Sequence, residues 1–239
     1  MTVAVRASRS EGAVLATDRH SFVFIGDRLW LDFVNTDDVE LGVRRDALRD
    51  FTTMLDWLVA AGVIDLDRRA AVMRRAEQQP AGATAALLDA RRVRGALRAL
   101  AERGLGNVDV RTEAVNEINR VLGRSAGTRR LEPLGDGHYA RSFVAGGDAF
   151  AALMIPVVDD AADALIDGEL ARVRRCSDPR CRRVFLDGTK NGRRRWCDMA
   201  TCGNRAKAAR HRARENPLRP TGRKYGQPAP IAAVPNAQG

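Results

Sequence analysis

Four cysteines are the residues of this chain whose type and spacing could do chemistry. They form two pairs, Cys176-x4-Cys181 and Cys197-x4-Cys202, with fifteen residues between the pairs. Zinc binds thiolates readily and takes four of them at tetrahedral corners, with Zn–S bonds of about 2.3 Å. The spacing therefore predicts one structural Zn²⁺ with four cysteine ligands, because four thiolates leave no coordination position for a reactive water.

Two other uses of the cysteines stay open from spacing alone. They could be unrelated buried or free thiols, or they could form a redox-active dithiol. Redox pairs usually have the spacing C-x-x-C, which neither pair has here. The start of the chain lacks the apolar run of a secretion signal, and nowhere do about 18 apolar residues follow one another. We therefore expect a cytoplasmic protein with reduced thiols and no membrane partner.

Basic residues are concentrated around the cysteines. The formal net charge is +10. Residues 172–224 hold 18 lysines and arginines against 4 aspartates and glutamates, and the rest of the chain holds 22 against 26. The sequence thus indicates a mildly acidic body and a strongly basic end. Such an excess favours an acidic partner, for which we expect DNA, with RNA as a possible second partner.

The elements around the cysteines must bring the two pairs together. We expect a strand in the sequence RRVFL (182–186), a turn at Asn191-Gly192 and a returning strand in RRRWC (193–197). Such a hairpin would bring Cys181 next to Cys197. A helix over 203–214 would then begin at Cys202, in a treble-clef-like zinc finger, and its stripe of Ala206, Ala209 and Ala213 would pack on the hairpin.

The basic side chains of this segment are the candidate nucleic-acid contacts. Few acidic residues balance these side chains, so their mutual repulsion persists unless an anion neutralises their charge. Arginine predominates over lysine, which suits bidentate contacts with phosphate or guanine. A solvated charged helix is the alternative. The candidates are Arg193, Arg194, Arg195, Asn204, Arg205, Lys207, Arg210, Arg212 and Arg214. Of the two at the helix start, we expect Arg205 to read a base and Asn204 to serve as a cap.

The body of the chain reads as mainly helical. Apolar residues recur at helical spacing in three segments, over 48–61, 85–104 and 112–123. The last of these places Val115, Ile118 and Leu122 on one face. A short strand is expected at 22–27 and a hairpin over 129–147, where Asp136-Gly137 marks the turn. A further helix over 148–170 should be bent or interrupted near Pro156. The predicted fold class is mainly α with a small β-hairpin component (α+β).

These patterns divide the chain into four parts. Residues 1–19 are expected to be a flexible N-terminus and residues 20–171 a helical domain. The zinc finger should span residues 172–216. Residues 217–239 are rich in proline and glycine, which is typical of a disordered tail.

Polar residues in the apolar segment LWLDFVNT (29–36) allow two interpretations. Asp32 and Asn35 lie among large apolar neighbours, so they should be partly buried and need hydrogen-bond partners. They could tie backbone segments together. Alternatively, they and Arg45 could line a pocket for a small-molecule effector, which would make the body a sensor.

The cysteine-rich end resembles the CGNR zinc finger family, which takes its name from a tetrapeptide found here at 202–205. The resemblance covers both cysteine pairs, the sequence FLD at 185–187, Asn191 and the sequence RRWC at 194–197. Proteins with this finger usually carry an ABATE domain, described as a stress-induced transcription regulator, and the segment LWLDFVNT resembles its signature. The resemblance implies a helical ABATE-like domain followed by a zinc finger.

Two classes of function follow. The leading prediction is a zinc-binding, DNA-binding transcription regulator with an N-terminal sensor or oligomerisation domain. The runner-up is an RNA-binding or protein-interaction module that uses the same finger. We do not expect an enzyme, because no P-loop, G-x-S-x-G or H-E-x-x-H motif is present. The sequence indicates no particular oligomeric state.

Overall fold

The computed structural model describes residues 22–40, 42–124, 127–133, 139–145, 150 and 152–215. The predicted flexible N-terminus (1–19) and disordered tail (217–239) therefore lie outside the described residues. In the part of the chain that is described, no helix is long and apolar enough to cross a membrane.

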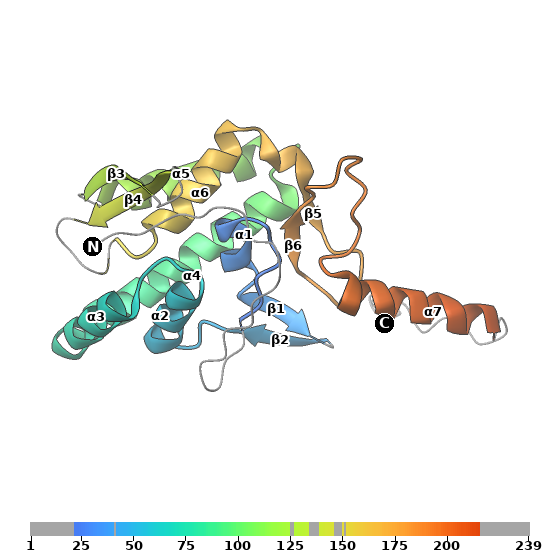
Figure 1. The fold of residues 1–239 in the computed structure, drawn as a ribbon, viewed down its shortest axis with the longest axis horizontal. Helices are drawn as coiled ribbons and strands as arrows, with labels where there is room; N and C mark the ends of the chain where they lie inside the picture. Colours follow the sequence, from blue (N-terminus) through green and yellow to red (C-terminus); the bar gives the residue numbers. More distant parts are fainter. Residues whose placement is uncertain are drawn as a thin grey trace, which may run out of the picture.

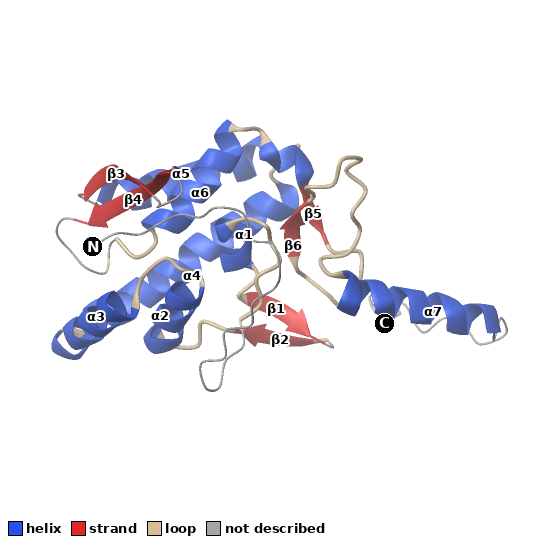
Figure 2. Cartoon of the chain, viewed as in Figure 1, coloured by secondary structure: helices blue, strands red, loops and turns tan. Residues whose placement is uncertain are grey.

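In the described part of the chain, the body contains six α-helices, with the long helix α4 at its centre (Figures 1 and 2). Helix α4 contacts α1, α2, α3 and α5, and α6 packs against α1 and α5. The bounds of these helices are α1 Leu29–Val34, α2 Phe51–Ala60, α3 Leu66–Gln78, α4 Pro80–Arg103, α5 Val108–Arg124 and α6 Ile155–Ile166. A seventh helix, α7 (Asn204–Glu215), extends away from the body.

Three antiparallel two-stranded sheets are found among the described residues. Strand β1 (Asp37–Glu40) pairs with β2 (Val43–Asp46), β3 (Gly127–Pro133) with β4 (Tyr139–Ala145), and β5 (Val173–Arg175) with β6 (Val184–Leu186). The predicted hairpin over 129–147 is confirmed, although its turn at Asp136-Gly137 lies outside the described residues. The expected fold class, mainly α with a small β component, is confirmed.

Local signals explain where the helices begin. The Asp50 carboxylate accepts a hydrogen bond from the Thr53 amide at 2.7 Å, and the Thr53 hydroxyl accepts one from the Asp50 amide at 3.0 Å. This reciprocal cap fixes the start of α2. Pro156 lies in the first turn of α6, where its missing N–H would have no partner in any case. The prediction of a helix interrupted near Pro156 is therefore wrong: the helix begins there.

The expected strand at 22–27 is also wrong, and a side chain explains why. No strand forms at these residues. Instead, the Asp32 carboxylate accepts hydrogen bonds from the backbone N–H groups of Ile25 at 2.8 Å and Gly26 at 2.7 Å. A Cβ atom on Gly26 would lie 2.7 Å from the Leu31 Cβ, so glycine allows this close approach. The carboxylate thus takes the place of a partner strand.

Helix α5 faces the core with a different set of residues than its apolar pattern predicts. Ile118 is buried as expected, but Val115 is 37% exposed. Glu117 is buried instead, and its carboxylate accepts hydrogen bonds from Arg92 at 3.0 Å and Arg120 at 2.8 Å. The two guanidinium groups satisfy the buried charge, which is what permits a glutamate at this position.

A single apolar core joins the body to the basic end of the chain. Trp30, Phe33 and Trp57 are fully buried in it, with the Phe33 and Trp57 rings 5.2 Å apart. The same cluster contains Val173 and Val184, from the sheet that carries the cysteines. The cysteine-bearing segment is therefore packed on the body through shared apolar contacts.

Candidate metal centre and basic helix

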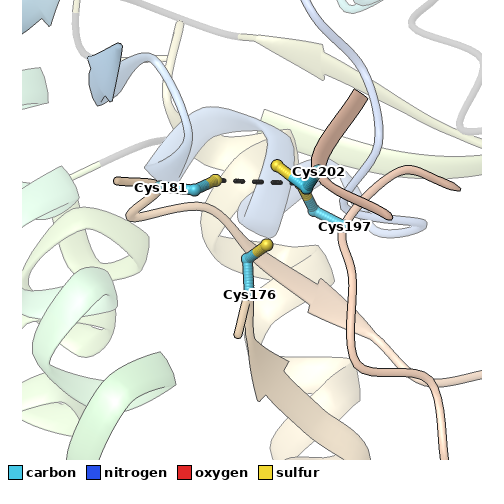
Figure 3. Close-up of side chains that lie close together, drawn as sticks. All are labelled: Cys176, Cys181, Cys197 and Cys202. Carbon is cyan, nitrogen blue, oxygen red and sulfur yellow. Dashed lines mark hydrogen bonds between the residues drawn. The ribbon is translucent and has the colours of Figure 1, made fainter. Parts of the chain in front are cut away.

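The β5–β6 hairpin and the segment before α7 position the four cysteines. Cys176 directly follows β5, and Cys181 lies in the loop that leads to β6. Cys197 and Cys202 come from the later segment, and Cys202 lies in a π-helical turn, Met199–Gly203, that runs into α7. Figure 3 shows the four side chains pointing toward one another. This treble-clef-like arrangement gathers residues from two separate parts of the finger.

The distances between the sulfur atoms fit one zinc ion. All four Sγ atoms lie within 4.8 Å of one another, with Cys181 to Cys197 at 3.8 Å and Cys197 to Cys202 at 3.6 Å. Tetrahedral Zn–S bonds of about 2.3 Å require sulfur atoms about 3.8 Å apart. All four cysteines are buried, and none forms a disulfide. The predicted single structural Zn²⁺ therefore fits the donor set.

Without a cation, the thiols of Cys176, Cys181 and Cys197 cannot all ionise together. Hydrogen bonds from Cys181 and Cys197 lower the pKa of Cys176. The hydrogen bond to Cys176 raises the pKa of Cys181 to about 12, and hydrogen bonds to Cys176 and Cys181 raise that of Cys197. The Cys176 thiolate thus accepts hydrogen bonds from the neighbouring thiols of Cys181 and Cys197, which stay protonated. A zinc ion removes this conflict, because its charge stabilises several thiolates at once.

The strand pairing around the cysteines differs from the prediction. Strand β6 pairs with β5, in the register Arg175 to Val184, and residues 193–197 form no strand. The buried Asp187 carboxylate explains the difference, because it accepts hydrogen bonds from the backbone N–H groups of Thr189 at 3.0 Å and Arg194 at 2.9 Å. The Thr189 hydroxyl also donates to this carboxylate. That bond lowers the pKa of Asp187 most, and the two backbone hydrogen bonds lower it further. The carboxylate closes the loop that a hairpin ladder was expected to close.

Arg205 supports the metal centre from the start of α7. Its Nε donates to the buried Asp178 carboxylate at 2.8 Å, and its Nη2 lies 2.9 Å from the Cys202 Sγ. Asp178 also accepts from the Arg180 N–H at 3.0 Å. The guanidinium is thus turned toward the sulfur ligands. Base reading by Arg205 stays a prediction. These contacts give its side chain a second role, which is to orient Cys202 as a zinc ligand.

Arg194 connects the finger to the body. Its Nη1 donates to the Asp27 carboxylate at 2.6 Å, its Nε donates to the Trp196 carbonyl at 3.1 Å, and its guanidinium carbon lies 4.4 Å from the centre of the Phe185 ring. These contacts hold the guanidinium against the protein. Arg194 is therefore less available to an external phosphate than its exposed neighbours Arg193 and Arg195.

Asn35 also joins the finger to the body. Its side-chain amide donates to the Val184 carbonyl at 2.8 Å and accepts from the Val184 N–H at 2.9 Å. Nearby, the Leu186 N–H donates to the Gly26 carbonyl at 2.9 Å. Strand β6 is therefore held by β5 on one side and by side-chain and backbone groups of the body.

The candidate ligand residues Asp32, Asn35 and Arg45 occupy different surroundings. The first two are buried and bind backbone groups, whereas Arg45 is exposed on β2. A pocket role for the three stays a prediction. Sequence reasoning missed a neighbouring cleft between α4 and the β1–β2 hairpin, which we call the arginine cleft. It is lined by Asp37, Arg44, Asp46, Arg91, Arg94, Gly95 and Arg98. The spacing of its three helical arginines in ARRVRGALR is the signal that could have found it.

Helix α7 presents its side chains to solvent. Every residue from Lys207 to Glu215 is exposed. The predicted packing of the alanine stripe on the finger is therefore wrong beyond Ala206, because Ala209 and Ala213 are exposed too. The helix projects from the finger (Figure 1), and no part of the described chain covers these two alanines.

The predicted nucleic-acid residues thus separate into two groups. Arg194 and Arg205 are held by contacts within the protein. Asn204 is exposed, and its side-chain amide donates to the Ala200 carbonyl at 3.0 Å. An N-cap would instead accept a hydrogen bond from a backbone N–H, so a cap role for Asn204 stays a prediction. The exposed basic side chains among the candidates are Arg193, Arg195, Lys207, Arg210, Arg212 and Arg214. Glu215 is the one acidic residue of α7, and its carboxylate lies 3.1 Å from His211 Nδ1.

Comparison with protein families gives two matches. Residues 27–168 match the ABATE family, described as "Putative stress-induced transcription regulator". Residues 172–215 match the CGNR zinc finger family. A search of curated proteins gives no match. The first match covers more than half of the chain, and the second covers the whole cysteine-bearing segment and α7.

Proposed function

Since this chain belongs to the ABATE family and carries a CGNR zinc finger, we propose that it is a transcription regulator that binds duplex DNA through α7. In this proposal the zinc ion is structural and the protein is not an enzyme. The finger domain extends over about residues 172–216, and the body before it acts as a sensor or oligomerisation domain in the cytoplasm.

The observation that carries the proposal is the exposure of α7. A helix of 12 residues is about 18 Å long and, with its side chains, about 10–12 Å across. The major groove of DNA, about 12 Å wide, admits such a helix. The side chains of Lys207, Arg210, Arg212 and Arg214 are all exposed on it. A solvated helix needs some means to offset such repulsion, and within α7 only Glu215 is acidic. Phosphates would supply the missing negative charge.

The metal centre supports the proposal by fixing where α7 starts. Cys202 lies in the turn that leads into the helix, and Asp198 accepts hydrogen bonds from the backbone N–H groups of Ala200 at 3.0 Å and Thr201 at 3.2 Å. Zinc bound to Cys202 would hold this turn in place. Arg193 and Arg195, exposed on the preceding loop, would add contacts to the phosphate backbone beside the helix.

Selection of bound fragments from a random duplex DNA pool tests this function directly. The zinc-loaded full chain should enrich a duplex sequence, and the same protein stripped of zinc by a chelator should not. A random RNA pool run in parallel distinguishes the leading proposal from its runner-up. Enrichment of RNA alone, or of neither pool, would overturn DNA binding in favour of an RNA-binding or protein-interaction module.

A further inference from the structure

The arginine cleft lies in the body, apart from the basic helix. It has a volume of about 480 Å³, which is within the range of about 300–1,000 Å³ that is typical of small-molecule sites. One wall is the face of α4 that carries Arg91, Arg94 and Arg98, and the other is the β1–β2 hairpin. A cleft of this size is large enough for a small metabolite.

The charges of the cleft favour an anion. Four arginines line it against two aspartates. Arg44 pairs with Asp37 at 2.8 Å, and Arg94 pairs with Asp46 at 2.7 Å. This pairing leaves the charges of the other two arginines, Arg91 and Arg98, without a matching carboxylate in the cleft.

Carboxylates near Arg91 and Arg98 offset only part of this surplus. Arg98 lies 3.1 Å from Glu102. The closest carboxylate oxygen found for Arg91 is that of Asp46, at 3.9 Å, and that carboxylate already accepts two hydrogen bonds from Arg94. Three cations at spacings of three and four residues on one helix face repel one another. An anion in the cleft would relieve that repulsion.

Two arginines of the α4 wall, Arg94 and Arg98, are held in place by the protein itself. The side chain of Arg94 is 5% exposed, and its Nη1 donates to the Thr36 hydroxyl at 2.9 Å in addition to Asp46. The side chain of Arg98 is 9% exposed, and its Nη2 donates to the Val34 carbonyl at 2.7 Å. A rigid guanidinium loses little entropy when a ligand binds, which raises affinity.

Unused donors remain at the cleft. Among the described residues, the hydrogen bonds found for Arg44 and Arg91 use only Nε and Nη2, so the Nη1 group of each is left for a ligand. An oxygen-rich anion is the class of ligand that these two groups would take.

From these features we infer that the arginine cleft binds a small molecule that carries an oxyanion group, a phosphate or a carboxylate. Guanidinium groups bind both with the same fork of donors. The inference gives the sensor role of the body a ligand class. Only that regulatory meaning rests on the proposed function, since binding itself does not require that the protein binds DNA.

Gly95 offers a way to block the cleft without removing a contact. It lies on the cleft wall within α4, and a Cβ atom built on it meets nothing within 4 Å. Replacement of a helix glycine by a better helix former should not destabilise the fold. Gly95→Leu therefore fills the cleft in a folded protein. Gly123 is a matched control, because it lies in α5, is exposed, and has the same open surroundings.

The experiment measures the melting temperature of the zinc-loaded full chain against increasing sodium phosphate, sodium succinate and, at equal ionic strength, sodium chloride. A ligand that binds only the folded state raises the melting temperature in a saturable way. Wild type and Gly123→Leu should respond to phosphate or succinate and not to chloride. Gly95→Leu and the rim variant Arg44→Gln should require at least about tenfold more anion.

The two anions distinguish the sources of the oxyanion group, since the one that saturates at the lower concentration identifies the class. The exposed helix α7 is intact in all four proteins, so anion binding there cannot produce a difference between them. Equal responses of wild type and Gly95→Leu would overturn the inference. So would the absence of a saturable response to either anion in wild type.

Discussion

Replacement of Asn35 tests whether the zinc finger depends on the body for its stability. In wild type the side-chain amide satisfies both the N–H and the carbonyl of Val184. Asn35→Ala leaves both groups buried without a partner, at a cost of about 1–3 kcal/mol each. The free energy of unfolding should therefore fall by about 2–6 kcal/mol, a large share of the about 5–15 kcal/mol that is typical of a whole domain.

Urea denaturation followed by tryptophan fluorescence measures this loss, because Trp30 and Trp57 lie in the core that the finger shares. Release of zinc to a colorimetric chelator should also be faster in Asn35→Ala, since Val184 lies three residues after the ligand Cys181. The control is Asn116→Ala, an exposed site on α5 where the change should be within about 0.5 kcal/mol. Wild-type stability together with wild-type zinc release in Asn35→Ala would refute the reasoning.

Three further variants probe the metal centre and the body. Cys202→Ser should lose stoichiometric zinc and also lower the melting temperature of the body, because Val184 lies in the body core; metal analysis and circular dichroism would show both. Arg205→Ala should weaken zinc affinity by about 10–100-fold, measured by competition with a chelator, because it removes the contact with the Cys202 Sγ. Burial would raise the pKa of Asp46, but hydrogen bonds and charge from Arg94 lower it overall. Its stabilisation is thus present above the ordinary pKa of about 3.9 and lost as pH falls below that value, so Asp46→Asn should melt below wild type at pH 6 and approach it near pH 3.

The metal centre could be predicted from the sequence because its chemistry depends on residue type and count. Two cysteine pairs in a basic segment indicate zinc whatever the strands around them do. The strand pairing could not be predicted. The carboxylate of Asp187 closes the loop from 187 to 194 in place of a ladder, and Asp32 does the same for residues 25 and 26. A pattern of apolar residues does not show which carboxylate will take over the role of a backbone partner.

The roles of individual arginines were equally hidden in the sequence. Arg194 and Arg205 lie in the same basic segment as Arg193 and Arg212, yet the first two bind groups of the protein and the last two are exposed. Their partners Asp27 and Asp178 lie 167 and 27 residues away in the chain. Only the fold determines which guanidinium turns inward, so a count of charges overestimates the surface that is free for DNA.

A salt titration of duplex DNA binding tests the central claim, that the zinc finger presents α7 to DNA. The proteins compared are zinc-loaded wild type, a variant with Lys207, Arg210, Arg212 and Arg214 replaced by Ala, and a control with the exposed Arg74 and Arg75 of α3 replaced by Ala. In wild type and the control, log affinity should fall with log salt at about −0.9 for each phosphate neutralised, and each α7 side chain that meets a phosphate should account for about one unit of slope. An affinity that does not depend on salt, or a slope that is unchanged in the α7 variant, would contradict the account.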